Sequence, residues 1–294
     1  MQLVDPLQTA RFKFIDFLLH FKGKLTRSEI VCRFGIGEAT ASRTIASYIE
    51  INPEAVVFLG SRNGYIAAEK FISAENHLAE DGLRYLAYGK VEETFLVETF
   101  GTGKVTIEQQ LDARLIGSIT RTMVNSQQVL IEYSSASSGK KTRILSPHSL
   151  FESSGSWYFR AYDFSVSEYR TFKFTRVVSA IPLGGEPSSK FSKSRDSTWN
   201  RIRNIHLIPH PNSNHPDSQF LDLGLPGAGQ KTIAASEACL GFLLNDLRVD
   251  CSKTYKLDSK QYPLALKNID ELYDIESMKM APGFCIQRNN SSRN

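Results

Sequence analysis

The amino-acid sequence predicts an α+β protein with helices first, a small β-barrel in the middle and an αβ unit at the end. Three observations support this order. Apolar residues recur at helical spacing in the N-terminal part, they alternate with a period of two after residue 129, and Gly/Pro/Ser-rich segments separate the later parts. A chain of 294 residues is long enough for two or three domains.

The bulk composition excludes several classes of protein. Hydrophobic residues make up 41% of the chain and charged residues 22%, which is ordinary for a globular protein in water. No stretch approaches the length of a membrane-spanning helix, so no membrane partner is expected, and MQLVDPLQTARFKF lacks the pattern of a signal peptide. The four cysteines form no CxxC pair, which argues against a zinc site and favours a reducing, cytoplasmic location.

Positive charge is concentrated in one part of the chain. The formal net charge is +4, but residues 140–203 alone carry 12 basic and 5 acidic residues, a net charge of +7. Such a local excess favours an anionic ligand or partner. The alternative is a solvated basic face without a specific ligand.

The first fifty residues have the spacing of three short helices. RFKFIDFLLHF (residues 11–21) places apolar residues at nearly helical intervals and is followed by a glycine. Thr26 and Glu29 form a capping box that begins a second helix, which Gly35 ends. A third helix is expected over residues 38–49. Its buried face is predicted on every fourth residue: Ala41, Ile45 and Ile49.

This order is the helix-turn-helix pattern, in which the third helix enters the major groove of DNA. AVVFLGSRNGYIAAE (residues 55–69) then indicates strand, turn and strand, which completes a winged helix-turn-helix domain over residues 1–70. Short polar side chains and arginine suit contacts to base edges and phosphates. The candidate DNA-binding residues are Thr40, Ser42, Arg43 and Ser47 on the third helix and Arg62 and Asn63 at the tip of the wing.

The small net charge of this domain affects how strongly it is expected to bind DNA. Residues 1–70 carry 9 basic and 7 acidic residues, so one copy would bind DNA weakly. A homodimer on an inverted-repeat site in double-stranded DNA is therefore expected. The alternative is a winged helix that contacts only protein.

The middle of the chain changes from helical to strand periodicity. Residues 71–128 are predicted to be a helical connector, in which GTGK (residues 101–104) indicates a turn rather than a phosphate-binding loop. Four short strands follow over residues 129–185, in VLIEYSS, TRILSPHSLFE, SGSWYFRAYD and EYRTFKFTRV. Short strands separated by turns predict a small, strongly bent barrel.

Arginines stand among aromatic residues on two of these strands. Alternation places Trp157, Phe159 and Ala161 on the core face of one strand and a Tyr158–Arg160–Tyr162 row on the other face. A cation between rings can hold a phosphate while a base stacks beside it. On the following strand, one face is expected to carry Arg170, Phe172, Phe174 and Arg176.

Four segments together resemble the WYL domain, an Sm-like small barrel named for a Trp-Tyr-Leu triplet. They are IEYSS, RILSPHSL, WYFRAYD and YRTFKFTRV. The third residue of the triplet differs in this chain, because Trp157 and Tyr158 are followed by Phe159 instead of leucine. The order of winged helix, WYL domain and C-terminal extension is similar to that of bacterial WYL transcriptional regulators. Within them, the chain most resembles the repressors that accompany BREX and CBASS phage-defence islands.

The resemblance implies a sensing site on the barrel for a nucleic-acid fragment or nucleotide. No cofactor and no metal are expected. The candidate ligand-binding residues are Tyr133, Ser134, Ser135, Arg143, His148, Tyr158, Arg160 and Arg170. Alternatives remain for some of them. His148 beside a proline would only cap a corner, Tyr133 would be a core ring with a satisfied hydroxyl, and the two serines would belong to a turn.

The C-terminal third is predicted to be a linker followed by an αβ extension. Residues 184–197 are rich in glycine, proline and serine, and residues 198–285 form the extension, which in WYL regulators supports dimerisation. RNIHLIPHP indicates a strand, and TIAASEACLGFLLNDLRVD (residues 232–250) indicates a helix. His206, His210 and His215 are close in sequence, but strand and loop positions are favoured over a metal site.

These observations predict a homodimeric repressor of a phage-defence operon, including its own promoter, that an anionic ligand controls. An activator would use the same parts. An enzyme acting on nucleic acid is disfavoured, because His148 with Ser134 or Ser135 is the only loose candidate for a base and nucleophile.

Overall fold

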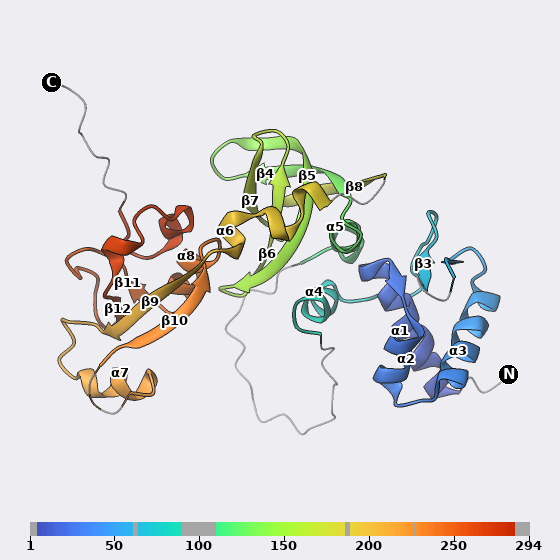
Figure 1. Cartoon of the computed structure of the whole chain (residues 1–294), viewed down its shortest axis with the longest axis horizontal. Coiled ribbons are helices and arrows are strands. Elements are labelled where there is room, and N and C mark those ends of the chain that lie inside the picture. Colours follow the sequence, from blue (N-terminus) through green and yellow to red (C-terminus); the bar gives the residue numbers. More distant parts are fainter. Residues whose placement is uncertain are drawn as a thin grey trace. The chain divides into compact units, whose positions relative to one another are not determined.

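The computed structural model describes residues 5–60, 64–89, 110–185, 189–225, 227 and 229–285. The chain forms two compact units, traced in Figure 1: residues 1–151 with 156–192, and residues 152–155 with 193–294. The first unit holds the segments predicted as winged helix, connector and barrel, and the second holds the C-terminal αβ segment. Within the described ranges, no helix is long and apolar enough to cross a membrane.

Three helices form the N-terminal domain where the sequence predicts them. They are α1 (Pro6–Lys22), α2 (Arg27–Phe34) and α3 (Glu38–Ile51). The Asp5 side chain caps α1 by accepting a hydrogen bond from the Leu7 amide at 3.0 Å, and Gly23 ends this helix in the left-handed conformation. In the predicted capping box of α2, the Glu29 carboxylate accepts from the Thr26 amide at 2.8 Å.

The buried face of α3 differs in part from the prediction. Ala41 and Ile45 are buried as expected, but Ile49 is only half-buried, and Thr44 and Tyr48 complete the buried face. The reason is geometric. A helix has 3.6 residues per turn, so steps of four residues drift about 40° each around the axis, and the third residue of such a series leaves the contact.

A small sheet completes the winged helix. Its strands, in the order β1-β3-β2, are β1 (Lys24–Leu25), β2 (Val56–Phe58) and β3 (Tyr65–Ala67). The hairpin between β2 and β3 narrows at Gly60 and Gly64, which both have positive φ, and the Leu59 amide donates to the Gly64 carbonyl at 3.0 Å. The two strands of the expected wing, β2 and β3, are therefore present.

Two helices connect the winged helix to the barrel. They are α4 (Ala79–Tyr88) and α5 (Ala113–Val124), and both pack against α1. A Cβ atom on Gly82 would lie 2.4 Å from the Phe21 ring, and one on Gly117 would lie 2.9 Å from the His20 carbonyl oxygen. Glycine is thus required at both contacts with α1. The predicted turn at residues 101–104 lies outside the described residues.

His20 of α1 makes a hydrogen-bonded contact with the first residue of α5. The ring is buried, and its Nε2 lies 2.8 Å from the Ala113 carbonyl oxygen, to which a neutral ring donates a hydrogen bond. Burial lowers the pKa of His20, and the nearby charge of Arg121 adds to this, although the hydrogen bond to Ala113 and the charge of Asp16 act in the opposite direction.

We expect His20 to destabilise the protein as the pH falls. Because the folded-state pKa lies below the ordinary value of 6.5, the unfolded chain binds more protons in the range between these two values. The free energy of unfolding should therefore decrease as the pH drops from about 7.5 to about 5.5. His20→Gln keeps a donor for Ala113 but cannot be protonated, so its stability should decrease less. Thermal unfolding of both proteins at each pH measures this difference, and equal pH dependence in the two would contradict it.

The barrel segment folds into one five-stranded sheet in the order β7-β6-β5-β4-β8. The strands are β4 (Gln128–Ser135), β5 (Gly139–Ser153), β6 (Ser156–Asp163), β7 (Glu168–Lys173) and β8 (Val177–Gly184). A single 3₁₀ turn, η1 (Phe174–Arg176), carries the chain from one edge strand, β7, to the other, β8. The buried Phe174 ring lies 4.7 Å from the Phe159 ring, so this turn covers the core between the two edges.

The second unit is built on a four-stranded sheet in the order β10-β9-β12-β11. The strands are β9 (Ile202–Pro209), β10 (Lys231–Ser236), β11 (Val249–Asp250) and β12 (Leu264–Leu266). The helices are α6 (Ser197–Asn200), α7 (Pro216–Asp222) and α8 (Leu240–Asp246). The 3₁₀ turns η3 (Lys193–Arg195), η4 (Ile269–Glu271) and η5 (Glu276–Met280) complete the unit.

The single helix predicted over residues 232–250 is wrong. This segment contains β10, the short helix α8 and β11. β10 pairs antiparallel with β9, with Ile233 opposite Ile205, and this pairing outweighs the apolar helical spacing of the segment. The strand structure of residues 231–236 depends on a partner strand about 28 residues earlier in the chain, which local periodicity does not reveal.

Candidate nucleic-acid interface and aromatic face

Helix α3 presents the predicted polar residues on its accessible side. Arg43 is exposed, and Thr40, Ser42 and Ser47 are partly exposed. The Arg43 Nε donates to the Ala39 carbonyl at 3.3 Å, which keeps the side chain along the helix surface. Four of the six candidate DNA-binding residues are thus on one accessible helix.

Sequence reasoning missed Arg27, which lies beside them. Its Nη1 donates to the Ser42 hydroxyl at 3.4 Å, and its Nη2 lies 3.3 Å from a Glu38 carboxylate oxygen. The position of Arg27, directly after the capping residue of α2, is the signal that would have found it. The other two candidates, Arg62 and Asn63, lie outside the described residues.

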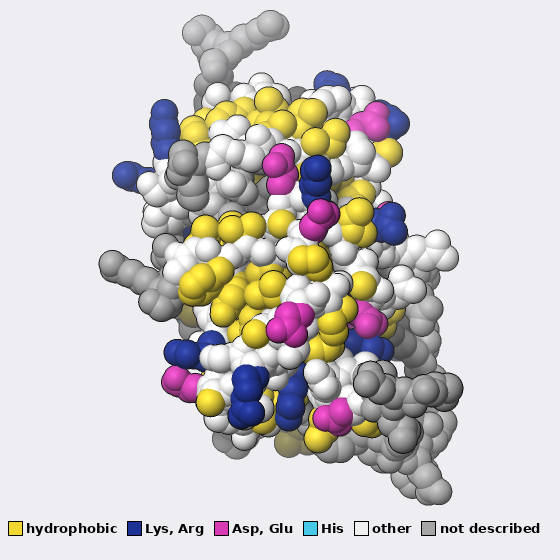
Figure 2. All heavy atoms as spheres, turned by 90° about the vertical axis from the view of Figure 1, so that its right-hand side faces the viewer, with side chains coloured by type: hydrophobic (Ala, Val, Ile, Leu, Met, Phe, Trp, Pro, Cys, Tyr) yellow, Lys and Arg dark blue, Asp and Glu magenta, His cyan; other side chains and the backbone are white. Residues whose placement is uncertain are grey.

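The surface around the winged helix is not uniformly basic. Figure 2 views the molecule from the side on which α1, α2 and α3 lie in Figure 1, and it shows hydrophobic side chains interleaved with both acidic and basic ones. Exposed hydrophobic residues of this domain include Val57, Phe58 and Leu59. On the face shown, acidic and basic side chains are mixed, and modest electrostatic attraction of one copy to DNA remains the expectation.

On the barrel, the predicted core face of β6 is confirmed, since Trp157, Phe159 and Ala161 are buried. The opposite face is not open, however. Arg160 is only 4% exposed, and its Nη1 donates to the Thr171 hydroxyl of β7 at 3.3 Å. The expectation of an accessible cation between two rings therefore needs correction, because this arginine is buried and hydrogen-bonded to the neighbouring strand.

Aromatic rings contact one another on this side of β5, β6 and β7. Tyr162 lies 5.2 Å from Tyr169 and stacks on Phe191 at 4.3 Å, measured between ring centroids, and the His148 ring lies 5.5 Å from Tyr169. Phe151 stacks on Tyr158 at 5.4 Å. We call this surface the aromatic face, and it comprises His148, Phe151, Tyr158, Arg160, Tyr162, Tyr169 and Phe191.

Phe191 and Tyr169 were not among the predicted residues. Phe191 belongs to η2 (Ser189–Phe191), inside the segment predicted to be a linker, and a lone phenylalanine between polar residues was the available signal. Tyr169 pairs directly with Tyr162 across β6 and β7, so the strand register was needed to place it.

The two arginines of WYFRAYD and EYRTF lie on opposite faces of the sheet. Arg160 pairs with Thr171, whereas Arg170 pairs with Ala161 on the face that carries Phe172. The Arg170 side chain is 44% exposed and forms an ion pair with Glu168 at 3.1 Å. Arg176 does not continue this row, because β7 ends at Lys173 and η1 interrupts the alternation.

The remaining candidates are used within the fold. Arg143 forms a buried ion pair with Asp163 and donates to the Ser165 hydroxyl at 3.0 Å. Tyr133 is a core ring whose hydroxyl accepts from the Lys173 amide at 3.1 Å, which is the alternative stated for it.

The serines and His148 also make local contacts. Ser134 is exposed, and the Ser135 hydroxyl lies 3.2 Å from that of Ser137 in the following turn. His148 Nδ1 lies 2.9 Å from the Ser149 hydroxyl. The aromatic face therefore brings together His148, Tyr158 and Arg160, but not the other five candidates.

A winged helix followed by a small barrel that carries arginine among rings defines the class of WYL-domain regulators. Comparison with protein families agrees: residues 8–88 match the BrxR transcriptional regulator winged helix-turn-helix domain, and residues 114–182 match the WYL domain. The chain is a WYL-domain regulator of the BrxR/CapW type.

Two relatives align along almost the whole chain. It is 26% identical over 277 residues to the DNA-binding transcriptional repressor CapW of Pseudomonas aeruginosa, covering 91% of each protein. It is 28% identical over 283 residues to the protein of the same name from Escherichia coli (strain KTE188), covering 90% of this chain and 91% of that one.

Among solved structures, proteasome accessory factor B/C (PafBC) of Arthrobacter aurescens aligns with 93% of this chain at 14% identity. The TM-score is 0.26, and the chain spans about half (47%) of that protein's length.

Proposed function

We propose that this protein is a DNA-binding transcriptional repressor that binds an inverted-repeat operator as a homodimer. The observation that carries the proposal is the row of short polar side chains and one arginine on the accessible half of α3. Relatives that align with about nine-tenths of the chain bear the name DNA-binding transcriptional repressor, which supports this reading. The operator lies in the promoter of a phage-defence operon that includes the gene of this protein.

An anionic effector, either a nucleic-acid fragment or a nucleotide, binds the aromatic face and shifts the dimer between DNA-binding states. Arg160 supplies charge within a cluster of rings, and the stacking of Phe191 on Tyr162 supports a surface that accepts a planar group. Control requires the effector to bind the two states with different affinities.

Contacts of two residues disfavour the enzymatic alternative. The predicted pairing of His148 with Ser134 or Ser135 receives no support, because the imidazole lies beside Ser149 and the Ser135 hydroxyl beside Ser137. A repressor acts where the chromosome is, so the cytoplasm of a bacterium is the proposed location.

Replacing Arg43 with alanine should weaken operator binding about 10- to 100-fold, which corresponds to about 1–3 kcal/mol for a specific arginine contact. The measurement is a gel-shift titration of the full chain against DNA from upstream of its own gene, with random DNA as competitor. Lys13→Ala is the matched control, because Lys13 is an exposed cation of α1 that pairs with Glu75. Equal affinity of Arg43→Ala and wild type, or no preference for the upstream DNA, would contradict the proposal.

The effector arm of this experiment uses short single-stranded oligonucleotides. They should release the wild-type protein and Arg43→Ala from DNA, whereas Arg160→Ala should bind DNA normally and no longer respond. Thermal unfolding of Arg160→Ala confirms that the variant folds. If Arg43→Ala and Arg160→Ala behaved alike, the division between DNA-binding and sensing surfaces would be wrong.

A further inference from the structure

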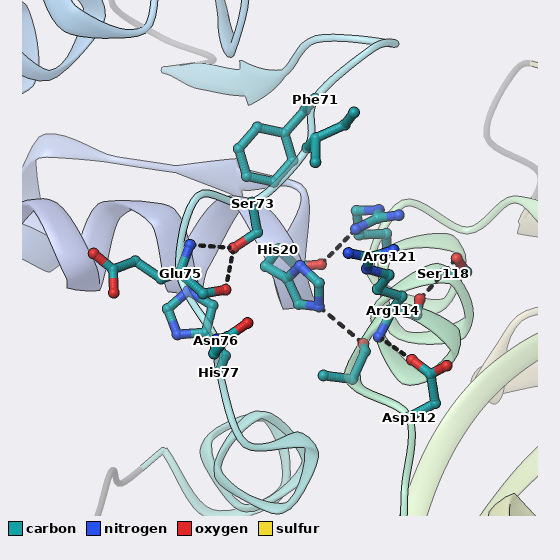
Figure 3. Close-up of a pocket in the computed structure, with 12 residues that line it drawn as sticks. His20, Phe71, Ser73, Glu75, Asn76, His77, Asp112, Arg114, Ser118 and Arg121 are labelled. Atoms are coloured by element: carbon teal, nitrogen blue, oxygen red, sulfur yellow. Dashed lines mark hydrogen bonds between the residues drawn. The ribbon is translucent and has the colours of Figure 1, made fainter.

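The first unit contains a cavity apart from both surfaces described above. Its volume is about 380 Å³, which falls within the range of small-molecule pockets. Figure 3 shows that side chains from three segments surround it: the end of α1, residues 71–77 and residues 112–121, most of which belong to α5. Its polar lining includes His20, Ser73, His77, Arg114, Ser118 and Arg121.

Two arginines of this cavity have no acidic partner among the described residues. The Arg121 Nη1 donates to the His20 carbonyl at 2.7 Å, and neither Arg114 nor Arg121 forms an ion pair in the part of the chain that the structure describes. Burial lowers the pKa of the Arg121 guanidinium. The cavity therefore holds positive charge that no described carboxylate compensates.

The carboxylates at the cavity are occupied by other donors. Asp112 caps α5 by accepting from the Arg114 and Leu115 amides at 2.8 and 3.3 Å. Glu75 forms its ion pair with Lys13, at 3.6 Å. Neither carboxylate is directed to a guanidinium, so an anion from outside would find both arginines available.

We propose that this cavity binds a small phosphate-bearing molecule, with Arg114 and Arg121 holding the phosphate. Guanidinium groups match phosphate oxygens in a two-point geometry. The apolar wall formed by Phe71 and Ile72 adds room for an attached group, up to the size of a nucleoside monophosphate. The ligand would contact segments of both the winged helix and the helix that leads into the barrel.

This position gives the ligand a route to the DNA-binding domain. Arg121 already joins α5 to the end of α1, and Gly117 allows the two helices to approach closely. A ligand that binds more tightly to one arrangement of α1 and α5 shifts the protein towards that arrangement. The site is distinct from the aromatic face and does not depend on the function proposed for it.

Isothermal titration of the full chain with inorganic phosphate and with AMP, at constant ionic strength, tests this site. Saturable binding of one molecule per chain is expected, and Arg114→Gln should weaken it at least about 10-fold. Arg114 is exposed, so this variant is expected to fold. Arg84→Gln on α4 makes the same chemical change outside the cavity and should bind as the wild type does.

The pattern of results separates the possible outcomes. Binding of phosphate alone identifies a phosphate site, and tighter binding of AMP extends it to nucleotides. No saturable binding of either probe would overturn the proposal. It would also be overturned if Arg160→Ala, rather than Arg114→Gln, abolished AMP binding, because the ligand would then occupy the aromatic face.

Discussion

Replacing Asp16 with alanine should cost the first unit about 3–5 kcal/mol of unfolding free energy, the usual effect of removing one partner from a buried charged network. Asp16 is 2% exposed, although it lies in the amphipathic helix α1. Its carboxylate accepts hydrogen bonds from the Tyr48 hydroxyl at 3.1 Å, the Ala74 amide at 3.1 Å and His77 Nε2 at 2.8 Å, and also from the Ser73 hydroxyl.

These donors also act on the pKa of Asp16. Burial alone would raise this pKa, but the hydrogen bonds from His77, Ser73 and Ala74 outweigh burial and hold it below the ordinary value of 3.8. The stabilisation is therefore complete above that value and is lost only as the pH falls through the lowered pKa. The effect of Asp16→Ala should be fully present at neutral pH.

Urea unfolding followed through Trp157 measures this loss in the first unit, in a Trp199→Phe background that removes the other tryptophan. Glu75→Ala is the control. It removes a nearby carboxylate whose exposed ion pair with Lys13 is worth no more than about 1 kcal/mol. If both variants lost equally little stability, Asp16 would not be the centre of this network.

Asp16 also illustrates which parts of the fold the sequence could predict. The helices of the winged domain follow from local signals such as the Thr26–Glu29 capping box, whose residues are three positions apart. The donors to Asp16 are 32 to 61 positions away. Apolar spacing predicts a helix around Asp16, but it contains no information on which distant segment satisfies a polar residue on its buried side.

In the barrel, too, the sequence predicted local structure but not the contacts between distant segments. Alternation correctly placed Trp157 and Phe159 in the core, because period two is a local property of a strand. It could not show that Phe191, about 30 residues later, stacks over Tyr162, or that Arg160 is buried. The strand motif indicated the face that carries Arg160, but Phe191, which stacks on this face, comes from a segment without strand periodicity.

The second large loss of stability is predicted for the second unit, where His210 contacts Asp250. Among the described residues, no group of three or more His, Cys, Asp and Glu side chains is placed to hold a metal. His210 is buried, and its Nε2 lies 3.1 Å from an Asp250 carboxylate oxygen, while its Nδ1 accepts from the Asn212 amide at 3.1 Å. Since Nδ1 accepts, Nε2 carries the proton and donates to Asp250.

Asp250→Ala should therefore destabilise the second unit by about 3–5 kcal/mol. The carboxylate is fully buried and also accepts from the Ser252 amide at 2.7 Å and the Leu257 amide at 2.9 Å, so its removal leaves three donors, two of them buried, without this acceptor. Unfolding followed through Trp199 in a Trp157→Phe background reports on this unit. Asp270→Ala, which breaks only an exposed ion pair with Lys253, should cost no more than about 1 kcal/mol.

The two carboxylates together test whether the units unfold separately. Each lies at the centre of a hydrogen-bond network within one unit, so Asp250→Ala should shift the Trp199 transition and leave that of Trp157 in place, and Asp16→Ala should do the reverse. A common shift of both transitions would mean that the units unfold as one cooperative body. Added zinc should change neither transition, because both ring nitrogens of His210 are already engaged.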